Sequence, residues 1–97
     1  MNVIAYRTVR AFANQYPEAE PFLRLWYNTL CKLEPRNFAE LKNQFPSVDS
    51  VPLKDGTIVF IFDVAGNNYR VVTRIDFEYQ VGFILYVFYP CRIHQME

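Results

Sequence analysis

Two arginines in the second half of the chain are the strongest candidates for chemistry. Arg70 and Arg74 lie four residues apart in YRVVTRIDF (residues 69–77), whose β-branched and aromatic residues predict a strand. Residues four apart in a strand point to the same face of a sheet. Cations on one face can stabilise a phosphate that is attacked by the neighbouring 2′-hydroxyl of RNA. The alternative is that both arginines are solvated on the polar side of a sheet, and the residues alone favour this alternative.

Two further groups of residues could support such a site. Gly66, Asn67 and Asn68 predict a hairpin turn, since Gly and Asn adopt positive φ readily. We prefer this structural role to direct contact with RNA, and Asn67 could position the turn that presents Arg70. Lys54 lies in a polar loop and could contact an RNA backbone. The alternative, that it is an exposed lysine without a function, is the simpler description.

The first half of the chain has the periodicity of helices, after a short first strand expected at residues 2–5. Apolar residues at positions 9, 12, 13 and 16 predict one helix that Pro17 ends. A second helix is expected to begin near Pro21 and to end before Pro35, with Phe22, Trp26, Leu30 and Leu33 along one face. Phe22, Trp26 and Tyr27 are spaced for the core or for a protein partner, and do not suggest base stacking. Asn37 and Glu40 resemble a capping box for a third helix over residues 38–44.

The second half of the chain reads as strands. Residues 57–64, 69–77 and 83–89 are β-branched or aromatic nearly throughout, with a turn at 65–68 and a connection at 78–82. Helices followed by an antiparallel meander predict an α+β fold with the helices packed on one face of a mainly antiparallel sheet. The apolar last strand is expected to leave an exposed edge that could support self-association.

Composition limits the class of protein. The 97 residues fit one domain, and 52% hydrophobic and 18% aromatic content supports a core. No apolar run is long enough to span a membrane, and the first residues do not resemble a signal peptide, so a cytoplasmic protein without membrane contact is expected. Ten basic and ten acidic residues cancel, which gives RNA binding no support from net charge. Cys31 and Cys91 fit free thiols, although a disulfide between them stays open, and neither has metal-site spacing.

Three segments together resemble the HigB toxins, members of the RelE/ParE-like superfamily. YPEAEPFLRLWYNTL (residues 16–30) is similar to the family's Pro-x-Ala-x-x-Leu-x-x-Trp-Tyr pattern. FAELKNQFPSVDSV (38–51) resembles its Leu-Lys-x-x-Phe-Pro-Ser-x-Asp segment. VFIFDVAGNNYRVVTRIDF (59–77) resembles its strand, Gly-Asn-x-x-Arg and second strand, and the similarity runs in order to about Phe88.

This resemblance implies a RelE-like fold over a single domain, residues 1–97. It implies a metal-independent endoribonuclease, without a cofactor, that cleaves mRNA in the ribosomal A site. It also implies a HigA-like helix-turn-helix antitoxin as partner, with operator DNA contacted only through that antitoxin. Arg70 is the arginine of Gly-Asn-x-x-Arg, so the resemblance favours a catalytic role in phosphate stabilisation there, and it leaves Arg74 open.

The end of the chain departs from the family pattern. HigB toxins finish their last strand with Thr-His-x-Glu-Tyr-Asp, which would supply acid, base and stacking groups, whereas residues 89–97 read YPCRIHQME. His94 is a poor replacement, being a lone histidine in a short tail. One permitted codon choice for residues 88–97, with a single T deleted, translates as Phe-Ile-His-Ala-Glu-Tyr-Thr-Lys-Trp. We hypothesise that a one-base insertion produced this tail, and the underlying DNA sequence tests the idea.

Two functions therefore stay open. The chain is either an active mRNA-cleaving toxin or a catalytically impaired homologue that only binds its antitoxin. A small sheet protein unrelated to toxins is the third alternative, and three segments in register count against it. A neighbouring gene for a helix-turn-helix protein would separate the first two from the third.

Overall fold

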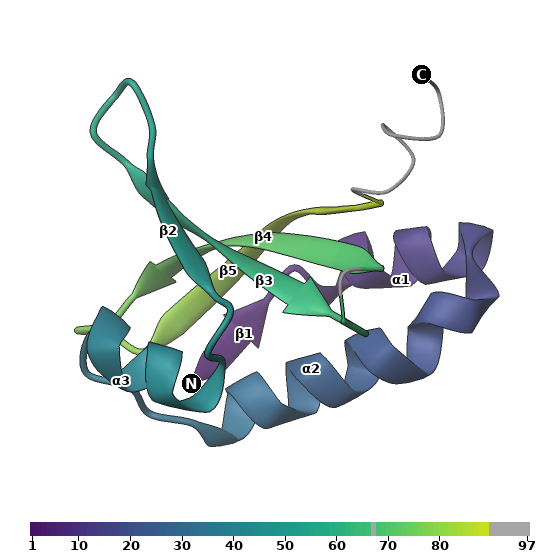
Figure 1. Cartoon of the computed structure of the whole chain (residues 1–97), viewed down its shortest axis with the longest axis horizontal. Coiled ribbons are helices and arrows are strands. Elements are labelled where there is room, and N and C mark those ends of the chain that lie inside the picture. The colour runs from purple at the N-terminus through teal and green to yellow at the C-terminus, as the bar shows by residue number, and fades with distance from the viewer. Residues whose placement is uncertain (67, 90–97) are drawn as a thin grey trace.

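The structure is a computed structural model that describes residues 1–66 and 68–89. Within them the chain forms three α-helices, one 3-10 helix and a five-stranded sheet (Figure 1). In chain order the elements are β1 (Asn2–Ile4), α1 (Tyr6–Gln15), η1 (Pro17–Ala19), α2 (Glu20–Lys32), α3 (Phe38–Gln44), β2 (Asp49–Pro52), β3 (Ile58–Val64), β4 (Tyr69–Asp76) and β5 (Val81–Phe88).

The sheet has the order β1-β5-β4-β3-β2. Strands β2 to β5 pair antiparallel with their neighbours, and β1 pairs parallel with the start of β5. The predicted α+β fold with a mainly antiparallel sheet is confirmed. The predicted exposed edge on the last strand is wrong where β1 pairs with it, from Val81 to Phe83.

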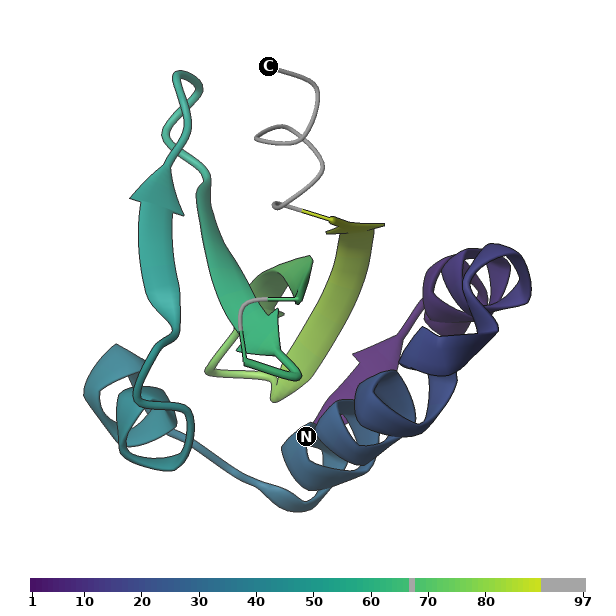
Figure 2. The same ribbon diagram turned by 45° about the vertical axis from the view of Figure 1, so that its right-hand side comes forward.

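The helices lie along one side of a curved sheet whose other face carries no helix within the described residues (Figure 2). Helix α1 packs against β5, and α2 packs against β1 and β3. The main core lies between these helices and the sheet, and its largest fully buried side chain is Phe62 of β3. We call this second face, which carries no helix within residues 1–66 and 68–89, the uncovered face.

The N-terminal half shows how local sequence sets the helix ends. Pro17 ends α1 as predicted and begins the 3-10 turn, and Pro21 falls in the first turn of α2. The buried face of α2 carries Leu23, Trp26 and Leu30. Phe22, predicted to share the face of Trp26, is half-exposed, because Leu23 takes the core position one residue further along.

The cap of α3 is confirmed with one change. The Asn37 side chain accepts a hydrogen bond from the Glu40 backbone N–H, 3.0 Å away. The Glu40 carboxylate returns to the backbone N–H of Arg36, at 2.9 Å, and also pairs with the Arg36 guanidinium. The reciprocal bond of a capping box is therefore displaced by one residue, and the helix spans the predicted residues.

Strand β2 was not predicted from the sequence. Its residues, DSVP, include an aspartate, a serine and a proline, all of which are depleted in strands. The strand lies at the edge of the sheet and pairs only with β3, a position in which proline is tolerated. It extends the uncovered face beyond β3.

Candidate RNA-contact face of the sheet

Arg70 lies on the uncovered face of β4, directly opposite Asp63 of β3. Its Nε donates a hydrogen bond to Asp63 Oδ1 at 3.1 Å, in an ion pair whose side chains are 41% and 21% exposed, respectively. A partly exposed pair of this kind contributes little to stability, because water screens both charges. It does hold the guanidinium along the sheet. A carboxylate partner for Arg70 on the next strand was not predicted.

Arg74 shares this face, as the spacing predicted, and is exposed. It lies opposite Phe83 of β5. On the same face of β4, Val72 lies between Arg74 and Arg70. Their Cα atoms are about 13 Å apart at the usual rise of a strand. The structure therefore presents the two cations as separate contact points along one strand.

The charge of Arg74 also reaches the loop between β2 and β3. The pKa of the Asp55 carboxyl is lowered, chiefly by hydrogen bonds from Thr57 and to a smaller extent by the positive charge of Arg74. The backbone N–H of Thr57 donates to Asp55 Oδ1 at 2.9 Å. This end of the face therefore carries both signs of charge.

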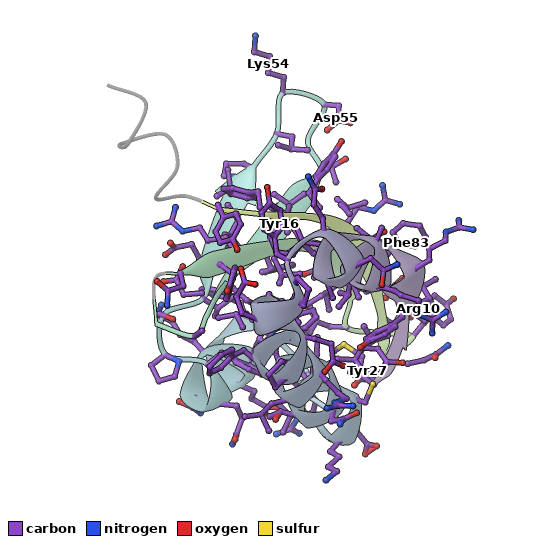
Figure 3. All side chains as sticks on the ribbon, turned by 90° about the vertical axis from the view of Figure 1, so that its right-hand side faces the viewer. Arg10, Tyr16, Tyr27, Lys54, Asp55 and Phe83 are labelled. Carbon is purple, nitrogen blue, oxygen red and sulfur yellow. The ribbon has the colours of Figure 1, made fainter. Side chains whose placement is uncertain are left out.

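Lys54 lies at the tip of the β2–β3 hairpin and points away from the rest of the molecule (Figure 3). Arg70 pairs with Asp63, near the opposite end of β3 from this tip. Lys54 and Arg70 are consequently separated by most of the length of β3, and the structure does not bring them together. An RNA contact at Lys54 would be a distant backbone contact.

The predicted turn between β3 and β4 is present. Ala65 and Gly66 have φ values of 55° and 68°, and the Asn68 N–H donates to the Ala65 carbonyl at 3.3 Å. Glycine accepts this left-handed backbone without strain. Asn67, the proposed organiser of the turn and an RNA-contact candidate, lies outside the described residues.

Aromatic side chains of β5 complete the face, and the sequence analysis did not find them. Phe83, Tyr86 and Phe88 lie opposite Arg74, Val72 and Arg70, respectively. Phe83 is 40% exposed and Tyr86 is 66% exposed. The strand therefore sets rings beside the two arginines of β4.

Tyr89, immediately after β5, points to the other side and joins an aromatic cluster with Phe12, Tyr16 and Tyr69. Its hydroxyl donates a hydrogen bond to Glu18 Oε1 at 2.9 Å. Burial raises the pKa of Tyr89 well above its usual range, and hydrogen bonds with Tyr69 and Glu18 raise it further. Tyr89 is therefore a neutral donor at physiological pH and does not serve as a base.

The raised pKa of Tyr89 predicts a pH effect on stability. A group whose folded pKa exceeds its unfolded pKa stabilises the fold below the unfolded value and loses that contribution as pH rises. Wild-type protein should therefore lose stability more steeply than Tyr89→Phe above about pH 10, the model-peptide pKa of tyrosine. Urea denaturation between neutral and strongly alkaline pH checks this. Equal slopes in the two proteins would contradict the prediction.

The remaining candidates are the two cysteines and His94. Cys31 is a free, partly buried thiol, whereas Cys91 and His94 lie in residues 90–97, outside the described part. Within residues 1–66 and 68–89, no three His, Cys, Asp or Glu side chains gather where they could hold a metal ion. The helices in those same residues are too short or too polar to span a membrane.

Comparison with known proteins agrees with this architecture. The family of HigB toxins, described as RelE-like toxic components of a toxin–antitoxin system, matches residues 19–88. The mRNA interferase toxin HigB of Escherichia coli strain K12 is 32% identical over 84 residues, which cover 87% of this chain and 79% of the relative. The mRNA interferases HigB of E. coli O157:H7 and Shigella flexneri match with the same identity and coverage. The family match stops at the last residue of β5, where the sequence leaves the expected C-terminal motif. From residue 19 through β5, this chain belongs to the HigB family of RelE-like toxins.

Proposed function

We propose that this chain is an endoribonuclease that cleaves mRNA in the ribosomal A site without a metal ion and thereby inhibits translation. One observation carries the proposal. Arg70 and Arg74 lie along one strand on the uncovered face of the sheet, in a family whose relatives are named mRNA interferases. The proposal places the protein in the cytoplasm, where ribosomes are found.

Arg70 is the residue that we assign to phosphate stabilisation. An arginine has five N–H donors, and Asp63 engages only the Nε–H through the hydrogen bond seen here. The terminal nitrogens are thus available to a phosphate oxygen while Asp63 fixes the direction of the side chain. Arg74, four residues further along β4, provides a second cation for the RNA backbone. Asn67 and Lys54 remain candidates for backbone contacts at the turn and at the hairpin tip.

A toxin of a toxin–antitoxin system has an antitoxin partner, as the family description implies. We propose that this partner is a HigA-like helix-turn-helix protein. In that arrangement operator DNA is contacted through the antitoxin, and the toxin contributes to repression only as part of the complex.

One observation favours a second function, that of an antitoxin-binding module without catalysis. The family match ends at residue 88, and the sequence beyond it lacks the His-x-Glu-Tyr motif that resemblance makes the source of acid and base. Arg70 and Arg74 can stabilise charge, because a guanidinium offers hydrogen-bond donors and no acceptor, so the acid and the base must come from other residues. The tail at residues 89–97 therefore decides between the two functions.

Induction of this chain in a bacterium tests the proposal, beside a version carrying the restored His-Ala-Glu-Tyr reading frame. Growth arrest with cleavage of ribosome-bound mRNA by the given chain supports the endoribonuclease. Arrest by the restored version alone shows that the given tail inactivates the toxin. If neither version cleaves mRNA while both bind the antitoxin, the endoribonuclease proposal fails and the binding module remains.

A further inference from the structure

We propose that Phe83, Tyr86 and Phe88 form a stacking platform for the bases of single-stranded RNA, with Arg70 and Arg74 contacting its backbone. We call the three rings the β5 aromatic row. This inference rests on the proposed function, because it names how the same face would hold its substrate. According to this inference, most of the affinity for RNA comes from the row and not from the two cations.

A β-bulge creates the row. Thr73 pairs with Ile84, whereas Val72 pairs with Tyr86, so Leu85 is the extra residue on β5. With strict alternation, Tyr86 and Phe88 would lie on the opposite face from Phe83. The bulge shifts the alternation by one residue and returns both rings to the uncovered face, as bulges do where a side chain must be redirected.

Burial on the two sides of β5 agrees with this register. Val87 and Tyr89 are packed against the core on the helix side, and Ile84 is fully buried there. Tyr86, by contrast, is 66% exposed and makes no aromatic contact within the part of the chain that the structure describes. The bulge thus redirects two large rings to the uncovered face, where Tyr86 is exposed to solvent and Phe88 is half-buried. Core packing does not explain their positions.

The charges on this face limit what cations can contribute. Arg70 and Arg74 share it with Asp63, and with Asp49 and Asp76 at its margins. The formal charges nearly cancel, so the release of counterions from RNA can supply only a small part of the affinity. Stacking on aromatic rings does not depend on net charge and is tolerant of base identity.

The alternation of rings and guanidinium groups favours RNA over an apolar protein segment. Phe83 lies beside Arg74 and Phe88 beside Arg70, so the two outer rings of the row each have a cation on the neighbouring strand, and Tyr86 lies between them opposite Val72. Single-stranded RNA offers base faces and phosphates in the same alternation, and sheet-based RNA modules use exposed rings in this way. An apolar segment would leave Arg74 buried without a partner, which is costly.

Binding of a short fluorescein-labelled single-stranded RNA, free and on programmed ribosomes, tests the platform. We expect Phe83→Leu and Tyr86→Leu each to weaken binding about tenfold or more, because leucine keeps apolar bulk but cannot stack. Tyr86→Phe keeps the ring and should bind like the wild type. If Arg70 and Arg74 make the two phosphate contacts, a plot of the logarithm of the association constant against the logarithm of the salt concentration should have a slope no steeper than about −1.4.

Tyr79→Leu is the matched control, since Tyr79 is 74% exposed but lies in the connection between β4 and β5, outside the row. Circular dichroism confirms folding of each variant. Normal RNA binding by Phe83→Leu and Tyr86→Leu, with loss in Arg70→Ala, would overturn the platform and leave the proposed function intact. Loss of antitoxin binding alone would assign the row to the antitoxin. Failure of wild-type protein to contact RNA in either setting would overturn both proposals.

Discussion

Arg70→Ala should lower cleavage of ribosome-bound mRNA by about 100-fold or more, in whichever version of the chain arrests growth. Loss of one preorganised donor to a developing negative charge typically has an effect of this size. The substitution also leaves the Asp63 carboxylate without its partner, 3.1 Å away in the present structure, on the face proposed to contact phosphate. Both consequences act in the same direction. Single-turnover cleavage of a defined mRNA on ribosomes measures the change.

Two variants serve as controls for this effect, and circular dichroism shows whether Arg70→Ala is folded. Arg24→Ala removes an exposed arginine that pairs with Glu20 on α2, away from the sheet face, and should cleave like the wild type. Asp63→Asn removes the competing charge but keeps a hydrogen-bond acceptor, so RNA affinity should rise or stay the same. Wild-type cleavage by Arg70→Ala would show that phosphate stabilisation lies elsewhere.

Much of the fold could be predicted because local signals and tertiary packing agree. Pro17 and Pro21 set the ends of helices, and Asn37 begins α3 at the predicted residue. The turn lies at the predicted residues and Gly66 has the positive φ that its residue type suggested, whereas the positive φ of Ala65 was not expected. These features depend on a few neighbouring residues, so a single sequence reveals them.

The candidate site was only partly predictable, because its assembly depends on register between strands. The shared face of Arg70 and Arg74 followed from strand periodicity alone. The Asp63 partner depends on how β3 pairs with β4, and the exposed rings depend on an extra residue, Leu85, in β5. Strict alternation would have assigned Tyr86 to the wrong face. Strand β2 was missed because its edge position tolerates residues that a central strand excludes.

Phe62→Ala should remove a large part of the stability of the domain. Phe62 is 1% exposed, and its ring lies 5.3 Å from that of Trp26 and 5.0 Å from that of Phe45, in edge-to-face geometry. Truncating a buried phenylalanine costs about 3–5 kcal/mol, through lost burial and the cavity left behind. A typical small domain has a free energy of unfolding of only about 5–15 kcal/mol. Urea denaturation followed by the fluorescence of Trp26 measures the loss.

Ile58→Ala provides the control on the same strand, since Ile58 is 49% exposed and should cost less than about 1 kcal/mol. Phe62 also precedes Asp63, the residue that orients Arg70, so the same packing that stabilises β3 fixes the position of the site. A Phe62→Ala protein that still folds should therefore bind RNA less well than its folded fraction accounts for. If Phe62→Ala lowers the free energy of unfolding by less than about 1.5 kcal/mol, the prediction is contradicted, because Trp26 and Phe45 would then have closed the cavity.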